Sequence, residues 1–165
     1  MTKMDMMLPL SEEHLTAIGR VTAYFSLLEN IANVLIADLL GLQSEDDVVS
    51  VTAHMMFLGK IQLITTLAST RFDDNKELKD LINEIIKEMD EANQKRNKIV
   101  HATWIYHSPK NNESGVLRRT ARGKLKTSLE GFTPEQINEV VTLIATTTGK
   151  IQQFLINKNG ELHFG

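Results

Sequence analysis

The chain contains no cysteine, few aromatic residues and no long uninterrupted run of apolar residues. Without cysteine it forms no disulfides and offers no thiolate metal ligands, which agrees with a reducing compartment such as the cytoplasm. The longest apolar stretch, residues 31–42, is interrupted by Asn33 and Asp38, so we expect no membrane-spanning segment. The N-terminal sequence MTKMDMMLPL lacks the apolar centre of a signal peptide. These absences predict a cytoplasmic protein with no membrane partner.

The length and composition are those of an ordinary globular protein. A chain of 165 residues can bury one substantial core. Its apolar fraction of 42% and charged fraction of 24% are typical of folded domains. The sequence shows no internal repeat and no low-complexity segment. We therefore expect a single helical domain over residues 1–165.

Apolar residues recur at helical spacing in four segments, which predicts four helices at about residues 11–40, 45–70, 75–101 and 134–157. Gly41 follows the first segment as a helix terminator, and Thr133-Pro134-Glu135-Gln136 is a capping box at the start of the last. Residues 102–131 lack this periodicity and contain strand-forming residues and a turn sequence at 108–112. The sequence predicts an all-α, antiparallel four-helix-type bundle with a basic β-hairpin or long loop inserted before the last long helix.

Charge is distributed unevenly along the chain. Residues 102–131 contain six basic and two acidic residues, a net charge of +4, which leaves −7 for the remainder of a chain whose total is −3. A basic segment on an acidic body favours local contact with a polyanion, and a solvated basic loop is an equally good interpretation. The candidate RNA-binding residues in this segment are Arg118, Arg119, Arg122, Lys124 and Lys126.

The third predicted helix ends in the sequence KRNKIVHATW, residues 95–104. On a helical wheel Asn97 and His101 share a polar stripe, whereas Arg96 lies in line with the apolar residues. An arginine in an apolar seam is costly unless its guanidinium is paired. Glu29 is a similarly misplaced charge on the apolar face of the first helix, so we expect an ion pair between Arg96 and Glu29. From these residues alone, a structural tie between helices and a catalytic site both remain open.

Metal chemistry is not indicated by the histidines. The chain has five, including His54 within the second predicted helix, and none has the spacing of a ligand motif such as His-Glu-x-x-His. We therefore expect a site with no metal and no other cofactor.

The run Arg96-Asn97-Lys98-Ile99-Val100-His101 resembles the signature of the HEPN domains, in which an arginine, often followed directly by asparagine, precedes a histidine by four to six residues. Its position at the end of a long helix in a helical bundle also fits. The segment at residues 25–29 resembles the acidic helix that many of these proteins pack against the motif. The resemblance covers about residues 15–157.

This resemblance implies a metal-independent endoribonuclease that cleaves RNA and acts as a homodimer with a composite cleft, as in toxins or phage-defence effectors. If the chain is a toxin, an antitoxin is a further expected partner. In that scheme His101 acts as general acid or base, Arg96 stabilises charge on the phosphate, and Asn97 orients these groups. The alternative is a non-catalytic HEPN-like module for RNA or nucleotide binding, or for dimerisation. Many toxin members carry tyrosine two residues after the histidine; here that residue is Thr103, so modification of such a tyrosine is not carried over. Trp104 fits a packing anchor better than a base-stacking residue.

Overall fold

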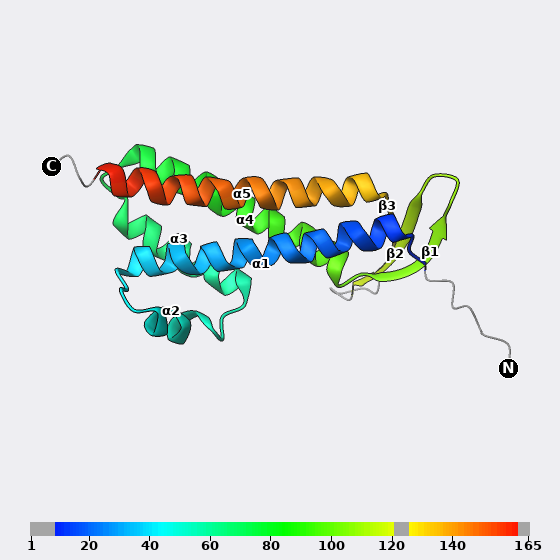
Figure 1. Cartoon of the computed structure of the whole chain (residues 1–165), viewed down its shortest axis with the longest axis horizontal. Helices are drawn as coiled ribbons and strands as arrows, with labels where there is room; N and C mark the ends of the chain where they lie inside the picture. Colours follow the sequence, from blue (N-terminus) through cyan, green and yellow to red (C-terminus); the bar gives the residue numbers. More distant parts are fainter. Residues whose placement is uncertain (1–8, 121–125, 162–165) are drawn as a thin grey trace.

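The computed structural model describes residues 9–120 and 126–161, and it is mainly helical (72%; Figure 1). Along the chain the elements are α1 (Glu12–Leu40), α2 (Glu45–Thr52), α3 (Phe57–Arg71), α4 (Lys76–Val100), β1 (Thr103–Ser108), β2 (Glu113–Thr120), β3 (Lys126–Phe132) and α5 (Pro134–Glu161). The predicted fold class, a helical bundle with an insertion of strands before the last long helix, is confirmed. The insertion is an antiparallel sheet in the order β1-β2-β3.

The three long helices lie side by side, and the sheet closes one end of the bundle (Figure 1). Helices α1 and α5 both begin at the sheet end and run in the same direction, whereas α4 runs the opposite way and stops beside the sheet. The end of α4 and the start of β1 therefore meet where the bundle joins the sheet. This junction carries the Arg96–His101 stretch.

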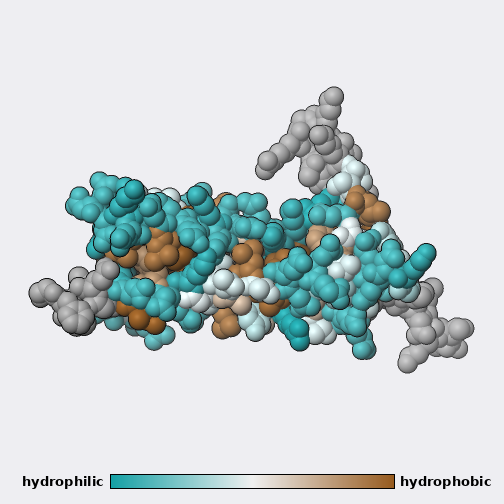
Figure 2. Space-filling model, turned by 90° about the horizontal axis from the view of Figure 1, so that it is seen from above, coloured by the Kyte–Doolittle hydropathy of each residue, from teal (hydrophilic) through white to brown (hydrophobic). Residues whose placement is uncertain are grey.

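One continuous core joins all the long helices, because each contributes an apolar stripe at helical spacing. The largest fully buried side chains are Leu28, Leu35, Ile36, Leu39, Ile64, Ile82, Ile85, Met89, Ile99, Ile137, Ile144 and Phe154. By length and hydropathy alone α1 is able to cross a membrane, which residues 31–42 by themselves did not suggest. In the structure its apolar stripe packs against α3, α4 and α5. The surface seen in Figure 2 is mostly hydrophilic, with separate small apolar areas.

The single helix predicted at 45–70 is wrong, because the helix breaks between Thr52 and Phe57 and the chain bends by 114° from α2 to α3. The buried residues of α3 recur every three or four positions from Phe57 onward. Continued backward at that spacing, the stripe would pass through His54, Ala53, Ser50 and Val49, all of which are exposed in the structure. One straight helix cannot bury both segments against α1, so the chain turns.

The predicted helix ends are largely confirmed. Gly41 closes α1 in the left-handed conformation with φ 71°. At the start of α5, Thr133 Oγ1 accepts from the Gln136 N–H at 3.3 Å, and Gln136 Oε1 accepts from the Thr133 N–H at 2.9 Å. This reciprocal pair is the capping box read from the sequence. Helix α5 continues to Glu161, past the predicted end at Asn157.

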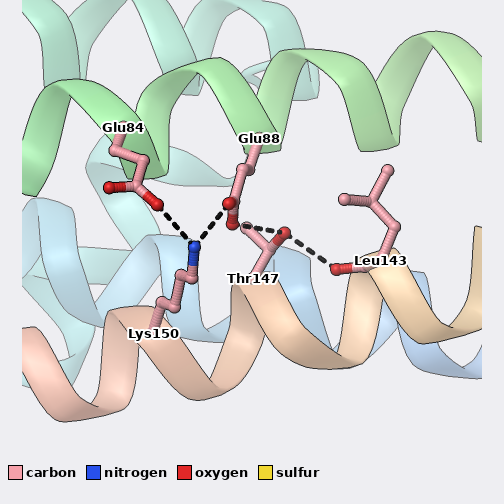
Figure 3. Close-up of polar contacts among 5 residues, drawn as sticks. All are labelled: Glu84, Glu88, Leu143, Thr147 and Lys150. Carbon is pink, nitrogen blue, oxygen red and sulfur yellow. Dashed lines mark hydrogen bonds and ion pairs between the residues drawn. The ribbon is translucent and has the colours of Figure 1, made fainter.

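A polar cluster fixes α4 against α5 (Figure 3). Lys150 Nζ donates to Glu84 Oε1 at 2.7 Å and to Glu88 Oε1 at 2.5 Å. The buried Thr147 Oγ1 lies 2.8 Å from the Leu143 carbonyl and 3.4 Å from Glu88 Oε2. The hydrogen bond and charge of Lys150 lower the pKa of Glu84, and its two carboxylate partners raise the pKa of Lys150. These contacts fix the position of α4 along α5, and with it the place where the last turn of α4 meets the sheet.

Candidate functional site

The candidate site begins where α4 ends. His101 is the C-cap, with φ −98° and ψ 18°, and its N–H reaches the Asn97 carbonyl at 3.3 Å. Helical geometry stops at this residue, and β1 begins at Thr103. Because the chain leaves the helix axis here, the His101 side chain is exposed instead of continuing the helical surface.

Arg96, Asn97 and His101, the three residues predicted as catalytic, come together at this point. Arg96 Nη1 donates to Asn97 Oδ1 at 2.8 Å and lies 3.0 Å from His101 Nε2. Asn97 Nδ2 in turn donates to Asn93 Oδ1 at 3.3 Å. A guanidinium has only donors, so Nε2 is the acceptor in this contact and the ring proton is assigned to Nδ1. One arginine group thus holds both partners.

The helical wheel predicts that Arg96 and His101 lie on different faces of the helix. This prediction is wrong for their side chains, which are in contact. The Arg96 backbone does lie on the packing side, and the guanidinium carbon is 4.9 Å from the centre of the buried Phe25 ring. Its Nε is buried without a hydrogen-bond partner in the described part of the chain. The far end of this long side chain turns back to the polar stripe. A helical wheel does not account for side-chain length. The long Arg96 side chain therefore links the packing side of α4 to its polar stripe.

The predicted ion pair between Glu29 and Arg96 is not formed. Glu29 Oε1 instead accepts from Lys60 Nζ of α3 at 2.9 Å, and over residues 9–120 and 126–161 Arg96 has no carboxylate within 4.0 Å. Lys60 was missed, although a signal was present. It lies three residues after Phe57 and four before Ile64, and so shares their buried face. The sequence therefore contained a second charged residue on an apolar face, Lys60, that could pair with Glu29.

Two hollows meet at the Arg–His pair. The first, of about 580 Å³, lies between α1, α3 and α4 and is lined by Phe25, Glu29, Met56, Phe57, Leu58, Asn93, Arg96, Asn97 and His101. The second, of about 510 Å³, lies between α4 and the sheet and is lined by Asn97, Lys98, His101, Ala102, Thr103, Val116, Leu117 and Arg118. Asn97 and His101 line both, so they form the ridge between the hollows. A ligand lying across this ridge would touch all three candidate residues.

The basic segment is only partly placed at the site. Arg118 lines the hollow beside His101, and its Nε lies 2.9 Å from Glu130 Oε2 on the next strand. Arg119 and Lys126 belong to the paired ends of β2 and β3, one and two pairs further out than Arg118 along the register. Arg122 and Lys124 lie outside the described residues. The structure therefore brings Arg118 to the candidate site, where its charge is paired with that of Glu130.

Trp104 is a packing anchor, as the sequence favoured. It is half-buried against the core, with ring centres 6.0 Å from Phe132 and 6.3 Å from His14. His14 itself is fully buried, a feature that the sequence reading missed. Its Nε2 donates to the Phe132 carbonyl at 2.9 Å, and its Nδ1 lies 2.7 Å from Ser11 Oγ. Both ring nitrogens are satisfied, so this histidine ties α1 to the end of the sheet.

In the part of the chain that the structure describes, the other histidines and acidic residues are not arranged as metal ligands. His54 is exposed. Over residues 9–120 and 126–161, no three His, Asp or Glu side chains gather as a ligand set. Tyr106 packs over Gly115 of β2, where a Cβ would overlap its ring, and its hydroxyl is 3.4 Å from Glu113 Oε1.

Comparisons of the chain with protein-family models, curated proteins and solved structures gave no match.

Proposed function

We propose that the chain is a metal-independent endoribonuclease of the HEPN type, with Arg96, Asn97 and His101 as its catalytic residues. The observation that carries the proposal is the contact of 3.0 Å between Arg96 Nη1 and His101 Nε2, on a ridge open to two hollows. A phosphate-binding cation and a proton acceptor converge there on one point. In phosphodiester cleavage by the ribose 2′-hydroxyl, a proton acceptor serves as general base and a cation stabilises charge on the phosphate.

The reaction follows from the donor and acceptor roles of these groups. When an RNA phosphate reaches the ridge, the Arg96 guanidinium exchanges its bond to Nε2 for a bond to a phosphate oxygen. The freed Nε2 of His101 accepts the proton of the 2′-hydroxyl, and the 2′-oxygen attacks phosphorus. The bond to the 5′-oxygen breaks, and that oxygen takes up a proton from water, while the proton gained by His101 returns to solvent. The products are a 2′,3′-cyclic phosphate and a 5′-hydroxyl.

The surroundings of the ridge suit a polyanion. Lys98 and Arg118 line the hollow next to His101, where they contribute phosphate contacts without sequence preference. No acidic side chain lines that hollow among the described residues. The RNA backbone would therefore lie between α4 and the sheet, with Asn97 and His101 below it.

A second copy of the chain is the proposed partner that completes the cleft. Helix α1 exposes Tyr24, Leu27 and Val34, which lie on one helical face. Between Arg20 and Asp38 the only charged residue of α1 is Glu29, and it faces the hollow with Arg96. An uncharged apolar stripe is self-complementary, as a two-fold interface requires. Light scattering of the purified chain would give twice the mass of one chain if this holds; a mass of one chain would reject the composite cleft.

The activity is tested with purified protein and RNA in excess EDTA. The wild type is expected to cleave and to leave cyclic phosphate ends, whereas Arg96→Ala and His101→Ala are expected to be inactive. Arg71→Ala and His54→Ala, which remove an exposed arginine and an exposed histidine of α3 and of the α2–α3 connection, are the matched controls and should cleave normally. RNA binding without cleavage by the wild type would favour the non-catalytic module instead.

In cells, the same proposal predicts growth arrest on overexpression that His101→Ala relieves. A protein that copurifies with the wild type and suppresses the arrest would be the antitoxin. Growth unaffected by the wild type, in cells shown to contain folded protein, would count against a toxin.

A further inference from the structure

The hollow between α1, α3 and α4 contains a carboxylate that the proposed reaction does not use. Glu29 lines it together with Arg96 and His101, and forms no ion pair with Arg96. Its partner Lys60 has a side chain only 5% exposed, whereas the Glu29 side chain is 40% exposed. The ion pair is therefore one-sided, which here means that the Lys60 ammonium is buried in the core and the Glu29 carboxylate is open to the hollow.

This one-sided pair has a chemical consequence. Burying a lysine ammonium costs free energy that its partner must offset. Lys60 donates to Glu29 Oε1 at 2.9 Å, and the charges of the two groups balance each other. Glu29 Oε2 makes no hydrogen bond in the described part of the chain. A fixed, charge-balanced acceptor thus faces the hollow without repelling an incoming phosphate.

The walls beside this acceptor are apolar. Met56 is 81% exposed and Leu58 is 49% exposed, and both line the hollow above the packed rings of Phe25 and Phe57, whose centres are 4.7 Å apart. Its volume of about 580 Å³ falls in the range of small-molecule sites, roughly 300–1,000 Å³. A flat group with an apolar face and a donor edge fits these walls. Unstacked RNA bases are recognised in this way, by apolar or aromatic contact and by hydrogen bonds to their Watson–Crick edge.

We propose that Glu29, positioned by Lys60, selects the nucleobase beside the cleaved bond by accepting a hydrogen bond from its exocyclic amino group. The inference rests on the proposed ribonuclease function and names the class of substrate. Carboxylates accept from amino groups such as cytosine N4. Uracil presents a carbonyl oxygen at the same position, which a carboxylate repels. The hollow therefore favours cytosine and other amino-bearing bases over uracil.

Binding of short oligonucleotides tests this selection without requiring cleavage. The His101→Ala variant, which leaves Glu29 and Lys60 intact, is titrated with oligocytidylate and with oligouridylate of equal length, and fluorescence anisotropy is measured. The two ligands differ at the Watson–Crick edge and little elsewhere. One charge-assisted hydrogen bond predicts about tenfold or more tighter binding of the cytidine oligomer.

In the His101→Ala background, Glu29→Gln keeps an oxygen for Lys60 but adds a donor, and it should bring the two affinities within about twofold of each other. Glu91→Gln, which alters an exposed pair with Lys95 on α4, is the control and should keep the preference. Circular dichroism confirms that each variant is folded. Equal binding of the two oligomers before the Glu29 substitution, or a preference that survives Glu29→Gln, would overturn the inference. Absence of cleavage by the wild type in EDTA, with the cytidine preference present, would overturn the ribonuclease instead.

Discussion

Removing Glu29 should destabilise the fold more than removing Lys60, although the two residues form one ion pair. Glu29→Ala leaves the Lys60 ammonium, which has a 5% exposed side chain, without its counter-charge. Loss of one partner of a buried pair costs roughly 3–5 kcal/mol. Because the Glu29 side is 40% exposed and admits water, we expect the lower end, about 3 kcal/mol. For a chain of this size that lowers Tm by about 6–12 °C.

The reverse substitution has a different consequence. Lys60→Met fills the same buried space with an apolar side chain and leaves Glu29 in contact with water, so its expected cost is about 0–1 kcal/mol. Urea unfolding followed by circular dichroism gives both free energies, and the double variant should recover most of the loss seen for Glu29→Ala alone. The reasoning is refuted if Lys60→Met costs as much as Glu29→Ala, or if the double variant is no more stable than Glu29→Ala.

Three further predictions concern the framework around the site. Gly115→Ala places a Cβ against the Tyr106 ring and should cost about 1–3 kcal/mol through the displaced ring, measured by thermal unfolding; an unchanged Tm would show that the ring moves freely. Thr133→Ala removes the side-chain acceptor that caps α5 and should cost about 1 kcal/mol, which urea unfolding measures. Lys150→Met should lower stability between pH 4.5 and 10.5 and converge with the wild type outside that window. The folded state lowers the pKa of Glu84 below its ordinary value of 4.5, so this contribution to stability is lost as the pH falls below 4.5. It raises the pKa of Lys150 above its ordinary value of 10.5, so this contribution is lost as the pH rises above 10.5. A constant difference at all pH values would contradict the pairing.

Much of the architecture could be predicted because local signals agree with the tertiary structure. The capping box at Thr133, the glycine after Leu40 and the apolar stripes each specify a helix end or a buried face, and the structure has them there. The break after Thr52 could not be read from apolar content. It depends on the phase of the α3 stripe relative to α1, which is a property of packing and not of any one segment.

The sequence predicted which residues gather at the candidate site, but not which of their side chains are in contact. Arg96, Asn97 and His101 stand close together in the sequence at the end of one helix, so their gathering needs little tertiary information. The partner of Glu29 does need it, because Arg96 and Lys60 both lie on apolar faces and only the helix arrangement decides between them. A long flexible side chain also reaches beyond its position on the wheel, as Arg96 does to His101.

The most direct test of the ribonuclease is the single-turnover rate at which a labelled single-stranded RNA is cleaved in EDTA by His101→Ala, compared with His54→Ala. General base catalysis contributes typically 10²–10⁴-fold, so His101→Ala should be slower by at least about 100-fold, while His54→Ala keeps the wild-type rate. Cleavage by folded His101→Ala at a rate within a few-fold of the wild type would contradict the assignment of His101 and the function built on it.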